Sequence, residues 1–398
     1  MKIAIMGFGV VGTGVAEIIT QNAAIIKKNS AKKIEIKYIL DIRKFPDSPF
    51  NNLIIDDFDK ILNDPEITTV AEVMGGINPA FDYVSRLLKK GKNVVTSNKE
   101  LVAQKGAILL KIAKENNTNF LFEASVGGGI PVIRPLNQCL TANKIIQIAG
   151  ILNGTTNYIL TKMIEDGKAF SEVLKETQEL GYAEKNPDAD VLGIDACRKI
   201  AILSSLSCGK HIYPDFVHTE GITNITLDDV RIAKEAGYVI KLIGQAKFHD
   251  DNSAFIMVSP CLVPLNNPMS SVNDVFNAIC IKGNFVDDVM FYGKGAGKLP
   301  TASAVVADII DCAKHLTNRK WVDWEDSDCS FVTDYKLEPS SFMLVLKNKE
   351  IDLRKFFSET IISNEFSVII NDITQKELEE KLEKNNIEII TKFRILDI

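Results

Sequence analysis

The first twelve residues place a short apolar run directly before a glycine-rich turn. Ile3 to Met6 form the run, and the turn reads Gly7-Phe8-Gly9-Val10-Val11-Gly12. Apolar residues from Val15 to Ile19 follow at helical spacing, so the segment predicts a strand, a tight turn and a helix. A Gly-x-Gly-x-x-Gly turn in this setting lets the backbone approach a pyrophosphate, whose charge the helix N-terminus favours. We predict a dinucleotide site here, with a purely structural glycine turn as the alternative. Its residues would be Gly7, Phe8, Gly9, Val10, Val11 and Gly12.

The residues after the second predicted strand bear on which dinucleotide would bind. The apolar run Ile34 to Leu40 ends in Asp41, and Arg43 and Lys44 follow. A carboxylate at this position suits the ribose 2′-hydroxyl of NAD, whereas basic side chains attract the 2′-phosphate of NADP. The sequence leaves both cofactors open.

Strand and helix signals alternate through the first 125 residues. Further strands are predicted at 68–74, 94–96 and 119–123, and helices at 58–62, 80–90 and 101–114. Strands separated by helices imply parallel pairing and right-handed crossovers. We therefore predict an α/β fold whose dinucleotide-binding domain, residues 1–130, is a doubly wound parallel sheet.

Glycines and polar residues follow three of these strands. They are Gly75-Gly76, Thr96-Ser97-Asn98-Lys99 and the turn from Glu123 to Pro131. Ligands of doubly wound sheets bind at the carboxyl ends of the strands, so Gly75, Ser97 and Lys99 are candidate contacts. A lysine at a helix start opposes the helix dipole. Lys99 therefore either contacts a ligand or is an ordinary solvated side chain.

The composition excludes several other classes of protein. The 46 Lys and Arg are outnumbered by 52 Asp and Glu in 398 residues, which disfavours a nucleic-acid partner. Apolar runs stay short of a membrane span, and no leader precedes Ile3, so we expect a cytoplasmic protein with a small-molecule substrate. The seven cysteines are widely spaced and lack any Cys-x-x-Cys pair, so neither a disulfide framework nor a zinc site is predicted.

An acidic turn leads into an apolar helix between Gly181 and Lys199. Asp195 and Lys199 are four residues apart and share one helix face, with Asp190 near the helix start and Glu184 in the preceding loop. An ordinary surface ion pair is one interpretation. The apolar neighbours favour burial, where charges need partners or a ligand. Structural and catalytic roles both stay open on these residues alone.

Taken together, these motifs resemble those of homoserine dehydrogenase. The matching segments run in the family's order: 7–14, 95–99, 123–131, 150–158, 181–199 and 293–308. The resemblance implies a Rossmann-type N-terminal domain completed by a returning segment at 293–320. It also implies an α+β domain for substrate binding and dimerisation at 131–292.

The same resemblance implies the reaction and the residues that perform it. The reaction is the reversible NAD(P)H-dependent reduction of L-aspartate 4-semialdehyde to L-homoserine, in threonine, methionine and isoleucine biosynthesis. Lys199 is the expected proton donor, and Glu184, Asp190 and Asp195 are the expected substrate contacts. Lys99 would contact both cofactor and substrate. The segment expected to close over the cofactor is Gly295, Ala296 and Gly297.

A monovalent cation and a dimer are implied as well. The family binds Na⁺ on the turn that follows the last strand of the first domain, and oxygen ligands suit such an ion. A bare glycine turn is the alternative. A homodimer is expected, with a tetramer as the alternative. The corresponding cation ligands here are Glu123, Val126, Gly128 and Ile130.

The C-terminal residues 335–398 are predicted to form a reduced ACT-like domain. Strands are predicted at 341–346, 366–370 and 387–396, and helices at 353–359 and 376–383. Compared with the ACT domain of longer family members, one strand is missing. The glycine that usually follows the first strand of an ACT domain is also absent, and Asn348-Lys349-Glu350 stand in its place. We therefore expect a domain retained for assembly rather than a threonine sensor.

Two rival functions remain. One is another NAD(P)-dependent semialdehyde or amino-acid dehydrogenase. Aspartate-semialdehyde dehydrogenase itself would need a cysteine nucleophile, and none of the cysteines lies in a convincing catalytic turn. The other is a non-catalytic nucleotide-sensing relative, which the intact Glu184, Asp195 and Lys199 disfavour.

Overall fold

The computed structural model describes residues 1–398 except 317, 321, 349–350, 358–359 and 363–366. The chain divides into two compact units, each built from three stretches of sequence. The first unit comprises Met1–Ala142, Ala201–Pro214 and Gly293–Asp328. The second unit comprises Asn143–Ile200, Asp215–Tyr292 and Cys329–Ile398.

The first unit is built on a six-stranded parallel sheet with the strand order β3-β2-β1-β4-β5-β6. This order is that of a doubly wound dinucleotide-binding fold, in which the order reverses between β1 and β4. The predicted fold class of this region is therefore confirmed. The strands are β1 (Lys2–Met6), β2 (Glu35–Leu40), β3 (Ile54–Ile55), β4 (Ile67–Glu72), β5 (Asn93–Thr96) and β6 (Phe120–Leu121).

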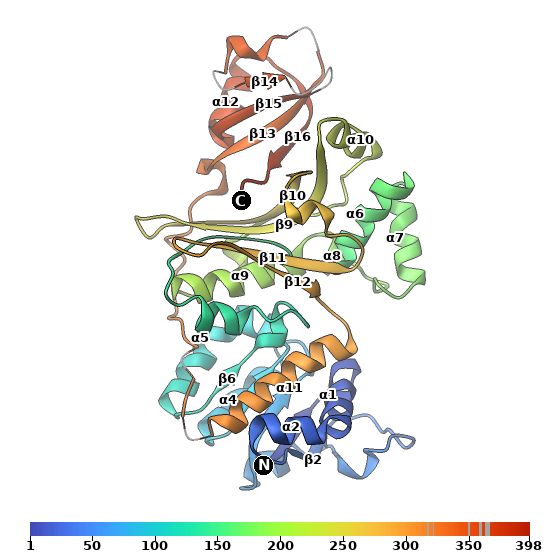
Figure 1. The fold of residues 1–398 in the computed structure, drawn as a ribbon, viewed down its shortest axis with the longest axis vertical. Helices are drawn as coiled ribbons and strands as arrows, with labels where there is room; N and C mark the ends of the chain where they lie inside the picture. The colour runs from blue at the N-terminus through green and yellow to red at the C-terminus, as the bar shows by residue number, and fades with distance from the viewer. Residues whose placement is uncertain (317, 321, 349–350, 358–359, 363–366) are drawn as a thin grey trace. The chain divides into compact units, whose positions relative to one another are not determined.

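Helices α1, α2 and α11 pack against one another, and α4 packs against α5 (Figure 1). The contact between α1 and α11 is close because Gly14 has no side chain. A Cβ at Gly14 would lie 2.9 Å from the Ala302 Cβ and 3.0 Å from the Lys298 carbonyl oxygen. The helices of this unit are α1 (Val10–Gln21), α2 (Ala23–Ser30), α3 (Phe58–Asn63), α4 (Ala80–Lys89), α5 (Lys99–Glu115) and α11 (Lys298–Lys314).

The second unit contains a long mixed sheet, ordered β12-β11-β7-β9-β10-β16-β13-β15-β14. Its centre is the antiparallel pair β9 and β10, and the short strand β8 also pairs with β10. The strands before residue 300 are β7 (Ile145–Ile151), β8 (His218–Thr219), β9 (Tyr238–Phe248), β10 (Ala254–Pro264), β11 (Phe276–Gly283) and β12 (Asp287–Lys294). The helices are α6 (Gly154–Asp166), α7 (Phe170–Glu179), α8 (Asp188–Val191) and α10 (Leu227–Glu235), while α9 (Ile194–Cys208) continues into the first unit.

The C-terminal residues extend this sheet through β16, which runs parallel to β10 with Cys261 opposite Arg394. Strand β13 follows in the order, and helix α12 packs on the last strands. The elements are β13 (Pro339–Leu346), β14 (Thr360–Ile362), β15 (Ser367–Thr374), α12 (Gln375–Lys384) and β16 (Ile389–Ile395).

Three local predictions need correction. The helix predicted at 353–359 is only a 3-10 turn, Leu353–Lys355, in its described part. The strand predicted to be missing is present as β14, where β-branched residues favour extended backbone. The run of polar residues at 153–157 predicts a turn, but it is the start of α6, because the Asn153 side chain accepts a hydrogen bond from the Thr156 N–H and caps the helix.

Among the described residues, no helix is both long enough and apolar enough to cross a membrane. Cys139 is exposed and Cys208 is partly exposed. The other five cysteines are buried, which is usual for small apolar side chains.

The close approach of α1 and α11 gives a first prediction. Gly14→Val should lower the free energy of unfolding by about 1–3 kcal/mol, because the added atoms overpack a contact with no free space. Thr20→Val is the matched control, since Thr20 is an exposed position of the same helix. Thermal unfolding followed by circular dichroism measures both variants. Equal midpoints for the two would contradict the packing argument.

Candidate active site

The glycine turn between β1 and α1 is closed by contact between its own backbone atoms. Gly7 has a φ of +97°, and a Cβ at Gly12 would lie 2.0 Å from the Gly7 carbonyl oxygen. At Gly9, by contrast, a Cβ would meet only the end of the Arg43 side chain, at 3.8 Å. Gly9 is also the N-cap of α1, and it has no side chain that could cap the first N–H groups of the helix. The turn therefore offers an open backbone surface at a helix N-terminus, which suits a pyrophosphate.

Asp41 is tied to this turn and to Arg43. Its carboxylate accepts a hydrogen bond from the Phe8 N–H at 2.7 Å and from the Arg43 Nε and Nη2 at 3.0 and 2.8 Å. The Arg43 guanidinium is the main reason that the Asp41 pKa falls to about 2. The Asp41 side chain is 6% exposed, whereas that of Arg43 is 59% exposed. A ligand at this edge would thus meet the guanidinium more readily than the carboxylate.

Glu72, at the end of β4, organises the next two loops and was not identified from the sequence. Its carboxylate accepts hydrogen bonds from the Thr96 hydroxyl at 2.6 Å and from the Met74 N–H at 2.9 Å. The Asn98 amide in turn donates to the Gly76 carbonyl oxygen at 2.6 Å. Glu72 is fully buried, and burial raises its pKa. A charged residue within the strand predicted at 68–74 was the available signal.

This arrangement positions the predicted contacts at the carboxyl ends of β4 and β5. Gly75 has a φ of +82° and is exposed. Ser97 and Lys99 are partly exposed, and Lys99 is the first residue of α5. Gly75 and Ser97 therefore lie on loops that the Glu72 hydrogen bonds connect, and Lys99 begins the helix that follows the second loop.

The turn that follows β6 packs against the segment leading into α11. A Cβ at Gly128 would lie 2.3 Å from the Gly295 carbonyl oxygen, and the Gly129 N–H donates to the Lys294 carbonyl oxygen at 3.1 Å. The first unit thus brings the predicted cation turn together with the predicted cofactor-covering residues Gly295, Ala296 and Gly297.

Glu123 holds this turn in place. Its buried carboxylate accepts three backbone N–H donors, from Val132, Ile133 and Arg134, at 2.7, 2.9 and 2.7 Å. Two of these donors share Oε1, and one bonds to Oε2. A carboxylate has about four acceptor sites, so these three bonds do not exhaust its capacity.

In the second unit, Asp195 and Lys199 form a buried ion pair on α9. The Lys199 Nζ donates to the Asp195 Oδ2 at 2.7 Å and to the Leu152 carbonyl oxygen at 2.6 Å. The Lys199 side chain is 7% exposed and that of Asp195 is 6% exposed, so the interpretation as a surface salt bridge is excluded. An ammonium largely removed from water costs free energy unless its surroundings compensate, and the carboxylate and carbonyl do so here.

Asn153 connects this pair to Asp190. Its Nδ2 donates to the Asp195 Oδ2 at 2.8 Å and to the Asp190 Oδ1 at 2.7 Å. Its Oδ1 caps α6, so each end of the amide has a fixed partner. Sequence reasoning treated Asn153 only as part of a polar turn. The signal that could have found it was an N-cap residue directly before a helix.

The structure does not join Glu184 to these residues. Glu184 is exposed in the loop between α7 and α8, and its backbone carbonyl accepts a hydrogen bond from the Gln178 Nε2 at 3.0 Å. No hydrogen bond connects the Glu184 carboxylate to another residue in the described part of the chain.

The first unit has a doubly wound sheet with an open glycine turn, and the chain also carries a buried lysine–aspartate pair. This combination is typical of NAD(P)-dependent oxidoreductases. The comparisons with known proteins name the family. The model of homoserine dehydrogenase matches residues 131–310, and that of the homoserine dehydrogenase NAD-binding domain matches residues 7–123.

Individual relatives agree along the whole chain. The homoserine dehydrogenase of Pseudomonas aeruginosa is 38% identical over 390 residues, which cover 96% of this chain and 89% of that one. The crystal structure of a homoserine dehydrogenase from Thiobacillus denitrificans superposes with a TM-score of 0.89 at 32% identity, covering 100% and 98% of the two chains. A hyperthermophilic archaeal homoserine dehydrogenase in complex with NADPH gives a TM-score of 0.66 at 28% identity, covering 78% and 96%. The chain belongs to the homoserine dehydrogenase family.

The two hydrogen bonds from the Asn153 amide give a second prediction. Asn153→Ser keeps an N-cap of similar quality but removes both donations to the aspartates. We expect kcat for homoserine oxidation to fall about tenfold, equivalent to roughly 1.4 kcal/mol, and its pH profile to shift. Asn267→Ser is the matched control, because Asn267 caps a short 3-10 helix with its side chain. Similar losses in both variants would assign the effect to capping.

Proposed function

We propose that this enzyme reversibly reduces L-aspartate 4-semialdehyde to L-homoserine with NAD(P)H, as a step in threonine, methionine and isoleucine biosynthesis. The observation that carries the proposal is the buried Lys199–Asp195 pair in a chain of this family. Family membership favours this reaction over another semialdehyde or amino-acid dehydrogenase. The intact charged pair argues against a non-catalytic nucleotide-sensing relative.

Lys199 is proposed to act on the carbonyl oxygen of the substrate. The bound nicotinamide supplies the hydride in reduction and accepts it in oxidation. Negative charge then grows on the oxygen, and an ammonium beside it stabilises that charge and delivers a proton. The Asp195 carboxylate at 2.7 Å favours the charged form of Lys199, which suits reduction. Oxidation needs Lys199 to accept a proton instead, so it should be favoured at alkaline pH.

The acidic residues around this pair are proposed to hold the polar groups of the substrate. Asp190 and Asp195 share the Asn153 amide, so their carboxylates lie close together and can face an amino and a hydroxyl group. Glu184 is proposed as a third contact on the exposed loop before α8. Carboxylates suit this task because they accept hydrogen bonds from both kinds of donor.

Both NADPH and NADH are proposed as cofactors. The exposed Arg43 and Lys44 attract a 2′-phosphate, and the ion pair with Arg43 offsets the repulsion from Asp41. The same Asp41 can accept a hydrogen bond from a 2′-hydroxyl. The pyrophosphate would lie on the Gly7–Gly12 turn. The remaining contacts are proposed to be Gly75, Ser97, Lys99, Gly295, Ala296 and Gly297.

A structural Na⁺ is proposed on the turn after β6. Its ligands would be the backbone oxygens of Val126, Gly128 and Ile130 together with Glu123, whose carboxylate keeps acceptor capacity beyond its three N–H partners. The residues present therefore fit a hard cation. The ion would hold a turn that Gly128 already presses against Gly295.

The assembly is proposed to be a homodimer formed through the sheet of the second unit. Strand β12 is the edge of that sheet, and Tyr292 and Met290 on it are 54% and 40% exposed. An edge strand with exposed large side chains is suited to pairing.

The chain is also proposed to consist of three domains. The dinucleotide-binding domain comprises residues 1–130 with 293–320, the substrate-binding and dimerisation domain residues 131–292, and the reduced ACT-like domain residues 335–398.

The role of Lys199 gives a third prediction. Lys199→Ala should lower kcat by about 10²- to 10⁴-fold, the usual contribution of a general acid. Nucleotide affinity, measured by fluorescence titration with NADPH, should change less than about twofold because the glycine turn is untouched. Lys162→Ala on α6 is the matched control, since that lysine pairs with Glu165 at the surface. Activity within a few-fold of the parent enzyme would remove Lys199 from the mechanism.

The Asp41–Arg43 pair gives a fourth prediction. Arg43→Ala should raise the KM for NADPH by about fivefold or more, roughly 1 kcal/mol, because it removes an attraction and unmasks the Asp41 charge. The KM for NADH should change far less. Lys111→Ala, at an exposed position of α5, controls for the loss of one positive charge. Steady-state kinetics with both nucleotides decide, and equal changes in the two KM values would contradict the assignment of Arg43.

A further inference from the structure

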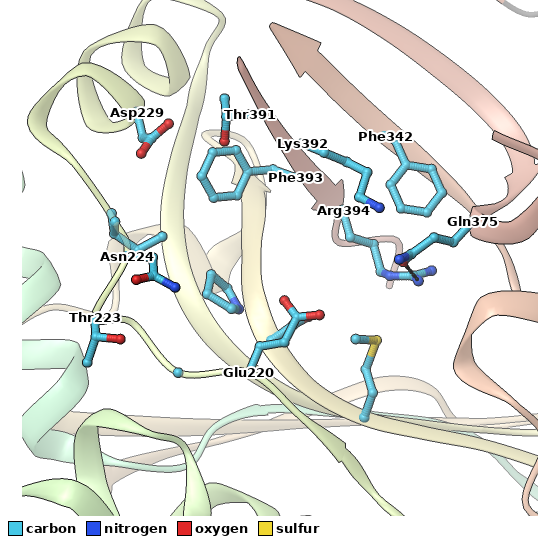
Figure 2. Close-up of a pocket in the computed structure, with 15 residues that line it drawn as sticks. Glu220, Thr223, Asn224, Asp229, Phe342, Gln375, Thr391, Lys392, Phe393 and Arg394 are labelled. Atoms are coloured by element: carbon cyan, nitrogen blue, oxygen red, sulfur yellow. Dashed lines mark hydrogen bonds between the residues drawn. The ribbon is translucent and has the colours of Figure 1, made fainter. Parts of the chain in front are cut away.

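A cavity of about 370 Å³ lies within the second unit, beside the junction of β10 and β16. Its walls come from the segment between β8 and α10, helix α10, strands β10, β13 and β16, and the first residue of α12. Figure 2 shows Arg394 and Gln375 on the side of the C-terminal strands, and Glu220, Thr223 and Asn224 across the space from them. None of its lining residues belongs to the active site proposed above.

Arg394 is the dominant group in this cavity. The residue is only 6% exposed, and its guanidinium lies 4.8 Å from the Phe342 ring centroid and 5.5 Å from that of Phe255. Its hydrogen bonds go to neutral acceptors. These are the Ser340 hydroxyl, the Gln375 Oε1 at 3.3 Å and the Tyr335 carbonyl oxygen at 3.5 Å.

Among the described residues this guanidinium makes no direct ion pair, although the Glu220 and Glu338 carboxylates act on it at longer range and raise its pKa. A buried charge without a counter-ion costs several kcal/mol in general, so such groups are normally paired or bind a ligand. Burial has the larger effect and lowers the Arg394 pKa from its usual range.

The other charged side chains of the cavity already have partners. Lys392 donates to Glu379 at 2.9 Å, and Asp229 accepts hydrogen bonds from Thr226 in a capping box. Glu220 contacts the His218 ring nitrogen at 2.9 Å and is 48% exposed. The cavity therefore holds a buried cation at one wall and an accessible hydrogen-bond acceptor at another.

These walls define the chemistry of a fitting ligand. A carboxylate matches the planar fork of a guanidinium and can accept two parallel hydrogen bonds from it. Glu220 and Asn224 across the cavity suit a hydroxyl or ammonium donor, while Met257, Pro260 and Phe393 supply apolar contact. We propose that this cavity binds a small organic carboxylate with a hydrogen-bond donor at its other end, and that Arg394 holds the carboxylate.

The test uses three hydroxy acids in which the hydroxyl lies progressively farther from the carboxylate: L-lactate, 3-hydroxybutyrate and 4-hydroxybutyrate. Each acid is compared with its neutral amide. Calorimetric titration of the full-length enzyme without nucleotide measures binding directly, and the Arg394→Gln variant distinguishes this cavity from the active site, which 4-hydroxybutyrate can also enter as the deamino analogue of L-homoserine. At least one acid should bind in the millimolar range while its amide does not. No binding by any acid at ~50 mM, or equal binding by acid and amide, would overturn the proposal.

Variants locate the binding. Arg394→Gln should weaken it at least tenfold, and Arg354→Gln should leave it unchanged, because Arg354 is an exposed arginine of the same C-terminal region paired with Asp352. Should Arg394→Gln fail to fold by circular dichroism, Glu220→Gln, at a more exposed wall, should still weaken binding several-fold. Unchanged binding in either folded cavity variant contradicts the assignment. Inorganic phosphate that binds as tightly as the acids would show a simple anion site and reject the carboxylate class.

Discussion

The ion pair between Lys199 and Asp195 is the interaction on which the proposed chemistry depends. Both side chains are nearly excluded from water, so each needs the other to stay charged. The Leu152 carbonyl and the Asn153 amide complete the arrangement, and Asn153 also begins α6. Helix formation and the orientation of the charged pair are therefore parts of one local structure.

The same requirement, that a buried polar group must have a partner, shapes both units. Glu72 connects the loops after β4 and β5, and Glu123 collects three backbone donors in the turn after β6. Arg394 is the contrasting case, since the acceptors around its guanidinium are neutral. This difference separates groups that hold the fold together from one that makes no direct ion pair among the described residues.

Close backbone approach is the second recurring constraint. Gly12 touches the Gly7 carbonyl, Gly14 faces α11, and Gly128 lies against Gly295. Each contact leaves no space for a Cβ, so glycine is required there for packing. The returning segment at 293–328 thus belongs to the first unit by direct contact, although most of the intervening chain belongs to the second.

The sequence by itself determined most strands and helices of the first unit, although not β3 or α2, together with the glycine turn and the shared helix face of Asp195 and Lys199. These features depend on local periodicity and on backbone preferences that neighbouring residues set. Prediction was weaker at 353–355, where a 3-10 turn stands in part of the expected helix, and at 360–362, where an unexpected short strand pairs with β15, because tertiary pairing overrides a weak local preference.

Only the tertiary structure decided which distant groups meet. The Lys199 partner Leu152 is 47 residues away, and the pairing of Cys261 with Arg394 creates one side of the C-terminal cavity. The structure also left Glu184 exposed and without a hydrogen bond from its carboxylate to Asp195 or Lys199. Such outcomes depend on strand register and loop closure across the whole unit, and no local pattern of residues encodes them.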